Sequence, residues 1–570
     1  MRRIALLLPV IILLCSFRAT ERDLFISGYF QPPVADLMRL SGTFGELRSN
    51  HFHAGLDIKG GMNVPILAAA DGYVSRISVS GSGYGNALYI DHPKGYTTLY
   101  GHLNAFSSDI ADYVRKEQEK RESFSVELYL KPGQFPVKQG EQVALMGTTG
   151  SSSGPHLHFE IRDSETEKAL NPLKFGLNFD QSSSLRLHQL KVYELDEEKQ
   201  FLHAEEYDPF YSGGEYNIRG NTITVRSPRI GLALKAYDHM NGGRNWNGIY
   251  GMDLEVDEHP IFRFRMDAIG FEESLYINAH LDYREYREER SYYNRCFLLP
   301  GNKCSIYQSV QNEGFIELEV GERVPVRMRV LGVGNTERIL TFWLEREPGS
   351  RPDPPVPHQY WLEHDQDNII SNFHLYMHLP QGAIYQDLPM TYNQAEEASF
   401  QVFSPVHSIH EPLTPVHKSF TLGIRPTLIP DELRDKAFIG RCTDNNRVVN
   451  YGGEWKDGML VTRTRTFGDY AIMVDEEKPD IRADRFQRDM RGWTSMRFRI
   501  DDNLPTSGMA RSLSWRATVD GKWALLVHDA KRDRLTYEFP DELESGEHSF
   551  RLEVTDAMGN VEVFEESFLR

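Results

Sequence analysis

Gly154-Pro155-His156-Leu157-His158-Phe159-Glu160 is the stretch of sequence from which the fold is best worked out. Its alternating pattern predicts a strand, because successive side chains of a strand point to opposite faces. The two histidines then share a face with the glutamate and lie roughly 6.5 to 7 Å apart along the backbone. The opposite face is apolar and suited to a core, with Leu157, Phe159 and Ile161. One histidine could bind a metal ion while the other reaches the metal's water, although a sheet with two chance histidines has the same pattern.

Further candidate ligands lie earlier in the chain. His53 and Asp57 form an HxxxD pattern, and glycines and Pro65 nearby favour an extended segment or turn over a helix. Short alternating segments at 73–79, 87–90 and 96–100, separated by glycine-containing turns, predict an antiparallel sheet. His102 follows the last of these strands. The residues alone do not decide which histidines bind a metal.

These motifs together resemble those of the lysostaphin and LytM-type zinc endopeptidases. The matching segments are 53–57, 100–103 and 147–150 leading to 154–160, in the same order, within about residues 40 to 176. The resemblance implies an antiparallel β-sheet peptidase domain in which Zn²⁺ is bound by His53, Asp57 and His158. It also implies that His102 and His156, which match the family's two non-ligand histidines, are catalytic.

The chemistry implied by this resemblance is self-consistent. Three protein ligands leave the fourth position of a tetrahedral zinc ion open for water or substrate. The sequence has no HExxH motif, so a histidine is the available general base. Glu160 is predicted either to support a ligand imidazole or to be a surface carboxylate at the strand end. Arg48 is predicted to line the substrate groove.

An insertion of residues 109–135 separates His102 from the HxH strand. It begins with a charged, helix-compatible run and then becomes extended. Its position between two catalytic motifs predicts that it borders the cleft and influences specificity. The alternative is that it packs against a following domain and covers apolar surface.

The N-terminus predicts export. In residues 1–19, Arg2 and Arg3 precede a short apolar run, which is typical of a signal peptide and too short to span a membrane. Cys15 is a candidate lipid anchor, and no later segment predicts a transmembrane helix in the mature chain. The expected location is the periplasm or cell envelope, as a secreted protein or an outer-membrane lipoprotein.

Length and composition predict a mainly β protein of several domains. A chain of 570 residues exceeds a single core, and its formal charge of -19 argues against nucleic acid as a partner. The expected division is a peptidase domain at 24–180, a β-sandwich at 185–347, a β-rich domain at 358–478, and a C-terminal immunoglobulin-like sandwich at 479–570. Proline-rich residues 348–357 are the predicted linker between the second and third.

Three cysteines remain in the mature chain. Cys296 and Cys304 flank a segment that resembles a hairpin, so a disulfide between them is predicted for an exported protein. Cys442 is then expected to be unpaired and buried.

The function that these observations favour is an exported zinc metalloendopeptidase that hydrolyses peptide bonds in peptidoglycan stems or cross-bridges during cell-wall remodelling. One alternative is a non-catalytic envelope regulator of other wall hydrolases. Degenerate regulators should lack ligands, however, whereas all five expected positions are filled here. A second alternative is a surface binding protein in which the β domains carry the main activity.

Overall fold

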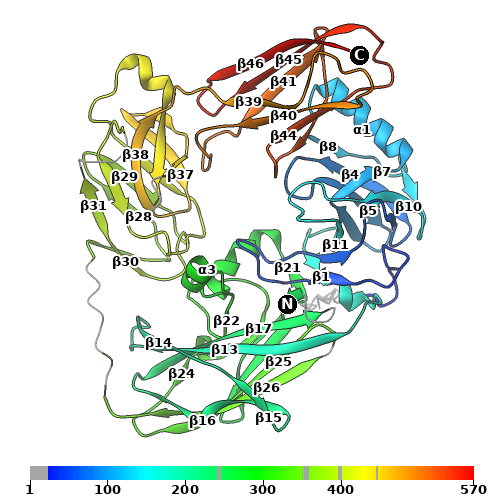
Figure 1. Ribbon diagram of the computed structural model, residues 1–570. Coiled ribbons are helices and arrows are strands. Elements are labelled where there is room, and N and C mark those ends of the chain that lie inside the picture. The colour runs from blue at the N-terminus through cyan, green and yellow to red at the C-terminus, as the bar shows by residue number, and fades with distance from the viewer. Residues whose placement is uncertain are drawn as a thin grey trace, which may run out of the picture.

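The computed structural model describes residues 24–240, 245–334, 336–349, 351, 358–395, 401–443 and 447–570. The predicted signal peptide, with Cys15, lies outside these residues, as does most of the predicted proline-rich linker. Within the described ranges, none of the helices has the length and apolar character needed to cross a bilayer. The mainly β fold predicted from the sequence is confirmed (Figure 1).

The N-terminal region is built on an antiparallel sheet whose central strands carry the sequence motifs. Its strand order is β1 (Leu40–Gly42), β2 (Leu56–Lys59), β11 (His156–Asp163), β6 (Tyr96–Gly101), β5 (Asn86–His92), β4 (Gly72–Val79) and β8 (Val126–Tyr129). A smaller sheet contains β3 (Pro65–Leu67), β10 (Gln142–Met146) and β7 (Leu103–Phe106). The apolar face of β11 is fully buried, as its alternating sequence predicts.

The next region, from residue 183 to 346, packs two sheets together. One contains β14 (Phe201–Tyr207), β13 (Ser183–Leu195), β17 (Arg229–Met240) and β18 (Asn245–Asn247), with β22 (Asn294–Arg295) and β24 (Ile316–Glu317) paired to β17. The other contains β15 (Phe210–Ser212), β16 (Glu215–Val225), β26 (Glu337–Arg346), β25 (Arg323–Leu331), β19 (Gly251–Val256), β20 (His259–Arg265) and β23 (Tyr307–Val310). We call this region the first β-sandwich. Its short helices are α2 (Ile277–His280) and α3 (Tyr283–Glu289).

Two further regions each place two sheets around a hydrophobic cluster of their own. The first sheet of the third region contains β28 (Asn368–Ser371), β29 (Leu375–Leu379), β33 (Phe420–Ile424), β37 (Met459–Thr464) and β36 (Glu454–Lys456). It packs on a second sheet of β31 (Tyr392–Ala395), β32 (Val406–Ile409), β38 (Gly468–Val474), β34 (Ala437–Cys442) and β35 (Val448–Asn450). Strand β27 (Tyr360–Leu362) pairs separately with β30 (Leu388–Met390). The C-terminal region contains β39 (Asp480–Arg485), β40 (Ser495–Asp501), β44 (Arg534–Glu538) and β43 (Leu526–Asp529), packed on β42 (Lys522–Trp523), β41 (Ser514–Val519), β45 (Glu547–Thr555) and β46 (Val561–Leu569).

The N-terminal region and the first β-sandwich share one hydrophobic core. Strand β12 (Ala169–Leu170) also pairs with β21 (Ala268–Ile269) across the junction. Because main-chain pairing and a shared core both cross this boundary, the first β-sandwich is a fixed neighbour of the N-terminal sheet.

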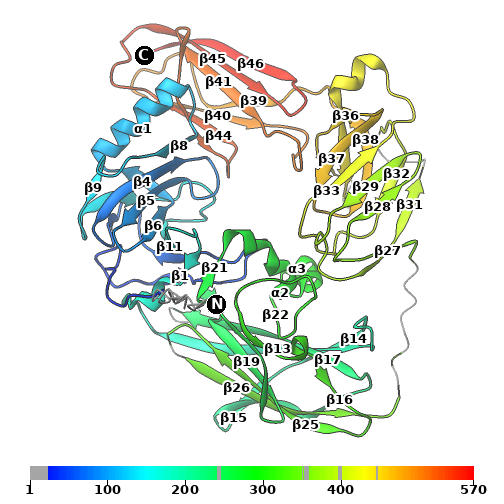
Figure 2. The ribbon, with the colours of Figure 1, turned by 180° about the vertical axis from the view of Figure 1, so that it is seen from behind.

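The four regions close into a ring, and the C-terminal region returns to the N-terminal one (Figures 1 and 2). The turn after β43 makes two hydrogen bonds there. Lys531 Nζ donates to the carbonyl oxygen of Ser152 at 2.9 Å, and Ala530 N donates to the carbonyl oxygen of Gly81 at 3.2 Å. The far end of the chain therefore contacts two loops of the N-terminal region.

The insertion at 109–135 lies elsewhere than predicted. It forms α1 (Ser108–Arg121) and β8, and β8 pairs with β4 at the edge of the sheet, where three strands separate it from β11. Glu122 forms an ion pair with Arg516, and Phe124 shares a pocket with Trp515 of the C-terminal region. The structure thus favours packing against a later domain over a position at the cleft. The sequence could not reveal this, because it does not show which domain returns to this edge.

The predicted disulfide is wrong. Cys296, Cys304 and Cys442 are all free. Strand β22, which precedes Cys296, pairs with β17 instead of folding back on the segment after Cys304, so no hairpin places the two sulfurs opposite each other. Cys296 Sγ instead packs 3.3 Å from Met252 Sδ, and burial raises the pKa of its thiol. Cys442 is half-buried, not buried.

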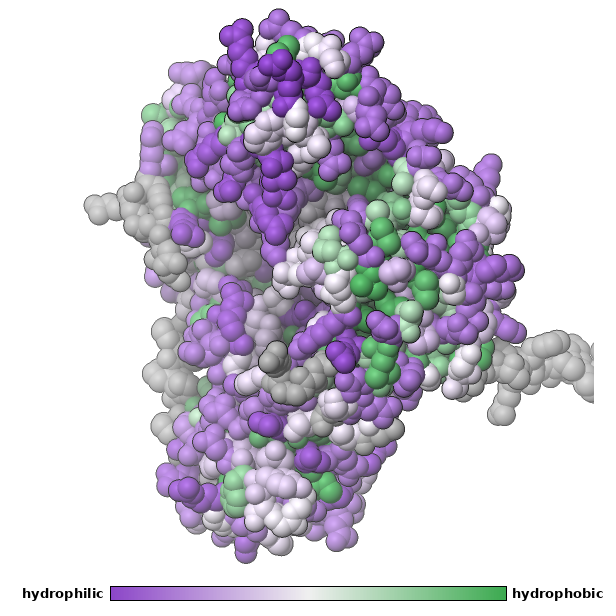
Figure 3. Space-filling model, turned by 45° about the vertical axis from the view of Figure 1, so that its right-hand side comes forward, coloured by the Kyte–Doolittle hydropathy of each residue, from purple (hydrophilic) through white to green (hydrophobic). Residues whose placement is uncertain are grey.

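The surface is mostly hydrophilic on the face shown in Figure 3, with scattered apolar side chains. This agrees with the strongly acidic composition and with charged groups on the outward faces of the sheets.

Candidate metal centre

The register of three strands brings the candidate ligands together. His158 in β11 lies opposite Asp57 in β2 and opposite Gly101, the last residue of β6, which His102 follows. His53 is fixed by main-chain hydrogen bonds between its segment and residues 45–46, at 2.8 and 2.9 Å. Segments separated by about a hundred residues of sequence therefore meet because the sheet aligns them.

Three ligand-type atoms form a nearly equilateral triangle. His53 Nε2 lies 3.1 Å from Asp57 Oδ1 and 3.1 Å from His158 Nδ1, and the third side, from His158 Nδ1 to Asp57 Oδ1, is also 3.1 Å. All three side chains are buried. Tetrahedral zinc with bonds of about 2.0–2.1 Å would hold its ligand atoms about 3.3 Å apart. The donor set and its spacing therefore fit zinc.

The outer nitrogens of the two ligand-type imidazoles are both engaged. His53 Nδ1 lies 2.8 Å from the carbonyl oxygen of Thr43, and His158 Nε2 lies 2.8 Å from Glu160 Oε1. Both partners can only accept a hydrogen bond, so these nitrogens carry the protons. A neutral imidazole then has an unprotonated nitrogen facing the triangle. Two lone pairs and a carboxylate oxygen converge there, which is an arrangement that a cation stabilises.

Electrostatics lead to the same conclusion. Burial alone would lower the pKa of His158, but Asp57 and Glu160 outweigh it and raise that pKa to about 9. Without a metal, the triangle therefore attracts a proton. Because a ligand imidazole must be neutral, metal binding releases that proton.

Glu160 supports His158 from behind and is not a surface carboxylate. Its side chain is fully buried, Arg162 Nε donates to Oε2 at 2.7 Å, and the Tyr84 hydroxyl donates to Oε1 at 2.6 Å. Burial alone would raise the pKa of Glu160, but Arg162 and His158 outweigh it and lower that pKa to about 2. The carboxylate therefore stays charged and fixes the orientation of the His158 ring.

Replacing Glu160 with glutamine is expected to weaken zinc affinity about 10- to 100-fold, because a neutral amide holds the His158 proton less strongly. Competition with a chelator of known affinity measures this change. Glu167→Gln is the matched control, since Glu167 also contacts Arg162, at 3.4 Å, but is exposed and remote from His158. Equal zinc affinity in the two variants would contradict the role of Glu160.

His102 and His156 lie next to the triangle, and the His102 ring centroid is 5.9 Å from that of His158. His156 Nδ1 lies 2.8 Å from the carbonyl oxygen of Gly154, and His102 Nδ1 lies 2.9 Å from that of Thr149. Both carbonyls fix the proton on Nδ1. His156 Nε2 is 3.5 Å from Asp57 Oδ1. The ring centroids of His102 and His156 are 4.8 Å apart. Two imidazoles thus border the candidate metal site.

The backbone at His102 is unusual. Its φ of 62° lies in the left-handed region, which few residues other than glycine adopt. Its amide donates to the carbonyl oxygen of Tyr84 at 2.8 Å, which holds this conformation. Burial, followed by the nearby His158 and His156, lowers the pKa of His102 to about 3. The ring therefore stays neutral at physiological pH.

Arg48, predicted to line a groove, contacts the ligand set directly. Its Nη2 donates to Asp57 Oδ2 at 2.9 Å, and its Nε lies 3.2 Å from Glu46 Oε1. Binding one oxygen of Asp57 leaves the other, Oδ1, directed into the triangle. Arg48 thus orients a candidate ligand.

Glu160 was named from the sequence as a possible support for a ligand imidazole, but the other supporting groups were not. The acceptors for the ring protons of His53, His102 and His156 are main-chain carbonyls, which leave no mark on residue identity. Tyr84 offered no signal either, because its contact with Glu160 depends on a turn that crosses the sheet.

Comparisons with known proteins agree with this geometry. Residues 51–119 and 124–172 match the family model described as Peptidase family M23. The resemblance inferred from the motifs is thereby confirmed for this segment, which we call the M23 segment. Residues 359–475 match a second model, described as a Zu5-like domain.

Similar proteins match this chain over part of its length. The DD-carboxypeptidase/endopeptidase Mpg of Neisseria meningitidis serogroup B is 33% identical over 144 residues, which is 24% of this chain and 27% of Mpg. The murein hydrolase activator NlpD of Escherichia coli is 35% identical over 133 residues, which is 23% of this chain and 28% of NlpD. The chain thus spans about a quarter of the length of these curated relatives. Among solved structures, the catalytic domain of the M23 protein EnpA from Enterococcus faecalis is 25% identical, covers 26% of this chain and 99% of its own, and has a TM-score of 0.20.

Proposed function

We propose that this protein is an exported zinc metalloendopeptidase that cleaves peptide bonds in peptidoglycan. The observation that carries the proposal is the triangle of His53, Asp57 and His158 with His102 and His156 beside it. A similar segment in a DD-carboxypeptidase/endopeptidase and in a murein hydrolase activator supports peptidoglycan as the substrate.

Each side chain has a role in this proposal. His53, Asp57 and His158 hold the zinc ion, which when bound polarises the scissile carbonyl and lowers the pKa of a bound water toward about 7. One of His156 and His102 would accept the proton of the attacking water at Nε2 and pass it to the leaving amine, and the ring that carries this proton would also donate to the oxyanion. Arg48 and Glu160 keep Asp57 and His158 oriented.

The remaining regions take supporting roles in the proposal. The division into domains at 24–180, 185–347, 358–478 and 479–570 is retained, with the last as an immunoglobulin-like module that contacts the loops at Gly81 and Ser152. Residues 1–19 direct export, either with cleavage or with lipid attachment at Cys15.

A non-catalytic regulator of other wall hydrolases is the second candidate, favoured by the similarity to a murein hydrolase activator. Incubating purified sacculi with the zinc-loaded protein and identifying released fragments by mass spectrometry separates the two. An endopeptidase releases new amino and carboxyl termini by itself, and chelation of zinc stops the release. A regulator releases fragments only when a partner hydrolase is added, and that result would overturn the proposal.

A further inference from the structure

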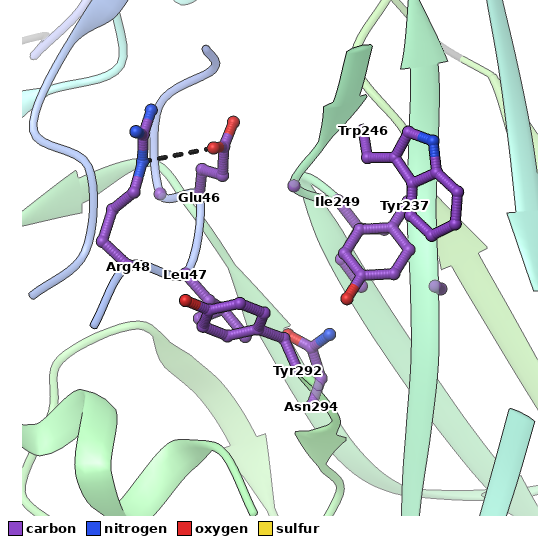
Figure 4. A pocket seen from close by; sticks show the side chains of 11 residues that line it. Glu46, Leu47, Arg48, Tyr237, Trp246, Ile249, Tyr292 and Asn294 are labelled. Atoms are coloured by element: carbon purple, nitrogen blue, oxygen red, sulfur yellow. Dashed lines mark ion pairs between the residues drawn. The ribbon is translucent and has the colours of Figure 1, made fainter. Parts of the chain in front are cut away.

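A pocket of about 170 Å³ lies beside the metal centre, where residues 45–48 of the N-terminal region meet the first β-sandwich (Figure 4). The side chains relevant to binding are Glu46, Arg48, Tyr237, Trp246, Tyr292 and Asn294. In Figure 4 the Glu46–Arg48 ion pair stands on one side and the rings of Tyr237 and Trp246 stand on the other. The pocket therefore has an aromatic wall facing a charged one.

The charged wall is shared with the metal centre. Arg48 lines the pocket and also donates to Asp57 Oδ2 at 2.9 Å. Two of its nitrogens are engaged, by Asp57 and by Glu46, and the guanidinium has five N–H donors in all. A molecule that contacts Arg48 in the pocket would thus be linked through this side chain to the candidate ligand Asp57.

The aromatic wall holds an exposed indole in a fixed position. Trp246 is 55% exposed, although its ring centroid lies 5.1 Å from that of His188, 4.9 Å from that of His239 and 5.2 Å from that of Tyr237. Three rings thus restrain a large apolar group that remains open to solvent. Rigid exposed aromatic side chains provide binding area at low cost in conformational entropy.

The two walls are also fixed relative to each other. Asn245, next to Trp246, accepts from Lys59 Nζ at 2.7 Å and donates to the carbonyl oxygen of Ser41 at 3.1 Å. Gly248 packs so closely that an added Cβ would lie 2.8 Å from Glu46 Cα. The pocket is therefore preformed, as binding sites for small groups usually are.

An aromatic wall opposite a charged wall suits a sugar ring. Such a ring has a face of C–H bonds that stacks on indole or phenol, and a rim of hydroxyl and amide groups that hydrogen-bonds to guanidinium, carboxylate and phenol. We propose that this pocket binds a sugar ring of the glycan strand to which the substrate peptide is attached. The inference rests on the proposed function and adds that the first β-sandwich selects glycan-linked substrate.

A pair of matched substrates tests the inference. One is a muropeptide that carries its disaccharide, and the other is the same peptide without sugar. The wild-type protein is expected to have a KM about tenfold lower for the glycan-linked form, and Trp246→Ala is expected to bring the ratio of the two kcat/KM values close to one. Trp361→Ala is the control, because Trp361 is similarly exposed, at 47%, and lies in the third region. It should keep the wild-type ratio.

Two results would overturn the inference. One is an equal KM for both substrates in the wild-type protein. The other is a Trp246→Ala variant that loses affinity equally for both, because the pocket would then hold a peptide residue.

A binding experiment without turnover separates this inference from the proposed function. Calorimetric titration of the zinc-free protein with an N-acetylglucosamine oligosaccharide is expected to show binding that Trp246→Ala weakens about tenfold and Trp361→Ala does not. If neither substrate is hydrolysed but this binding is found, the proposed function fails and the sugar site stands. If hydrolysis is found without any binding of the oligosaccharide, the sugar site fails alone.

Discussion

Replacing His158 with alanine is expected to reduce retained zinc from about one ion per chain to background and to abolish hydrolysis. The substitution removes one corner of the triangle and leaves two protein ligands, while Glu160 remains bound to Arg162 and Tyr84. The buried carboxylate thus keeps two partners, so the sheet is expected to fold. Elemental analysis after dialysis against a weak chelator measures the loss.

His51→Ala is the matched control for zinc content. His51 lies two residues before His53, is exposed and hydrogen-bonds to Asn50 Oδ1 at 2.8 Å. It should retain zinc as the unmodified protein does. Full zinc occupancy in the His158 variant would remove this residue from the ligand set.

Alanine at His102 or His156 is expected to leave zinc content intact and to reduce turnover about 10²- to 10³-fold. Neither ring is a corner of the triangle, and both lie beside it, so their loss is expected to affect proton transfer and not metal binding. Initial rates on a defined peptide, with zinc measured on the same samples, separate the two effects.

His548→Ala is the control for this pair of variants, because that histidine pairs with Asp520 on the C-terminal region. It is expected to turn over at the unmodified rate. A His102 or His156 variant as fast as this control would exclude a catalytic role for the residue replaced, and a variant that loses zinc would make it a ligand.

The ligand set could be proposed from sequence because its signal is local. His53 and Asp57 lie four positions apart, and His156 and His158 alternate on one strand, so short motifs carry the residues that the sheet later aligns. The resemblance to a known family was needed to separate ligands from the other histidines. Geometry supplies an independent reason for the same division, since three atoms form the 3.1 Å triangle while His156 Nε2 stands 3.5 Å from Asp57.

The errors came from contacts between distant segments. The Cys296–Cys304 prediction assumed a local hairpin, but β22 finds its partner in β17, some sixty residues earlier. The insertion was predicted to border the cleft because it lies between two motifs in the sequence. Its Glu122 instead forms an ion pair with Arg516, a contact that depends on the C-terminal region returning to the N-terminal one. The pocket at Trp246 was missed for the same reason, because its two walls come from different regions.

The closed ring of four regions affects how fast the loops beside the candidate metal centre can move. Surface loops ordinarily move in nanoseconds to microseconds, whereas whole domains move in microseconds to milliseconds. The loops at Gly81 and Ser152 are held by residues 530 and 531, and the Ser152 side chain in turn contacts the His156 ring at 3.2 Å. Large movements of these loops must therefore break the contacts or carry the C-terminal region along. Movement of these two loops is then expected on the microsecond-to-millisecond timescale of domain motion.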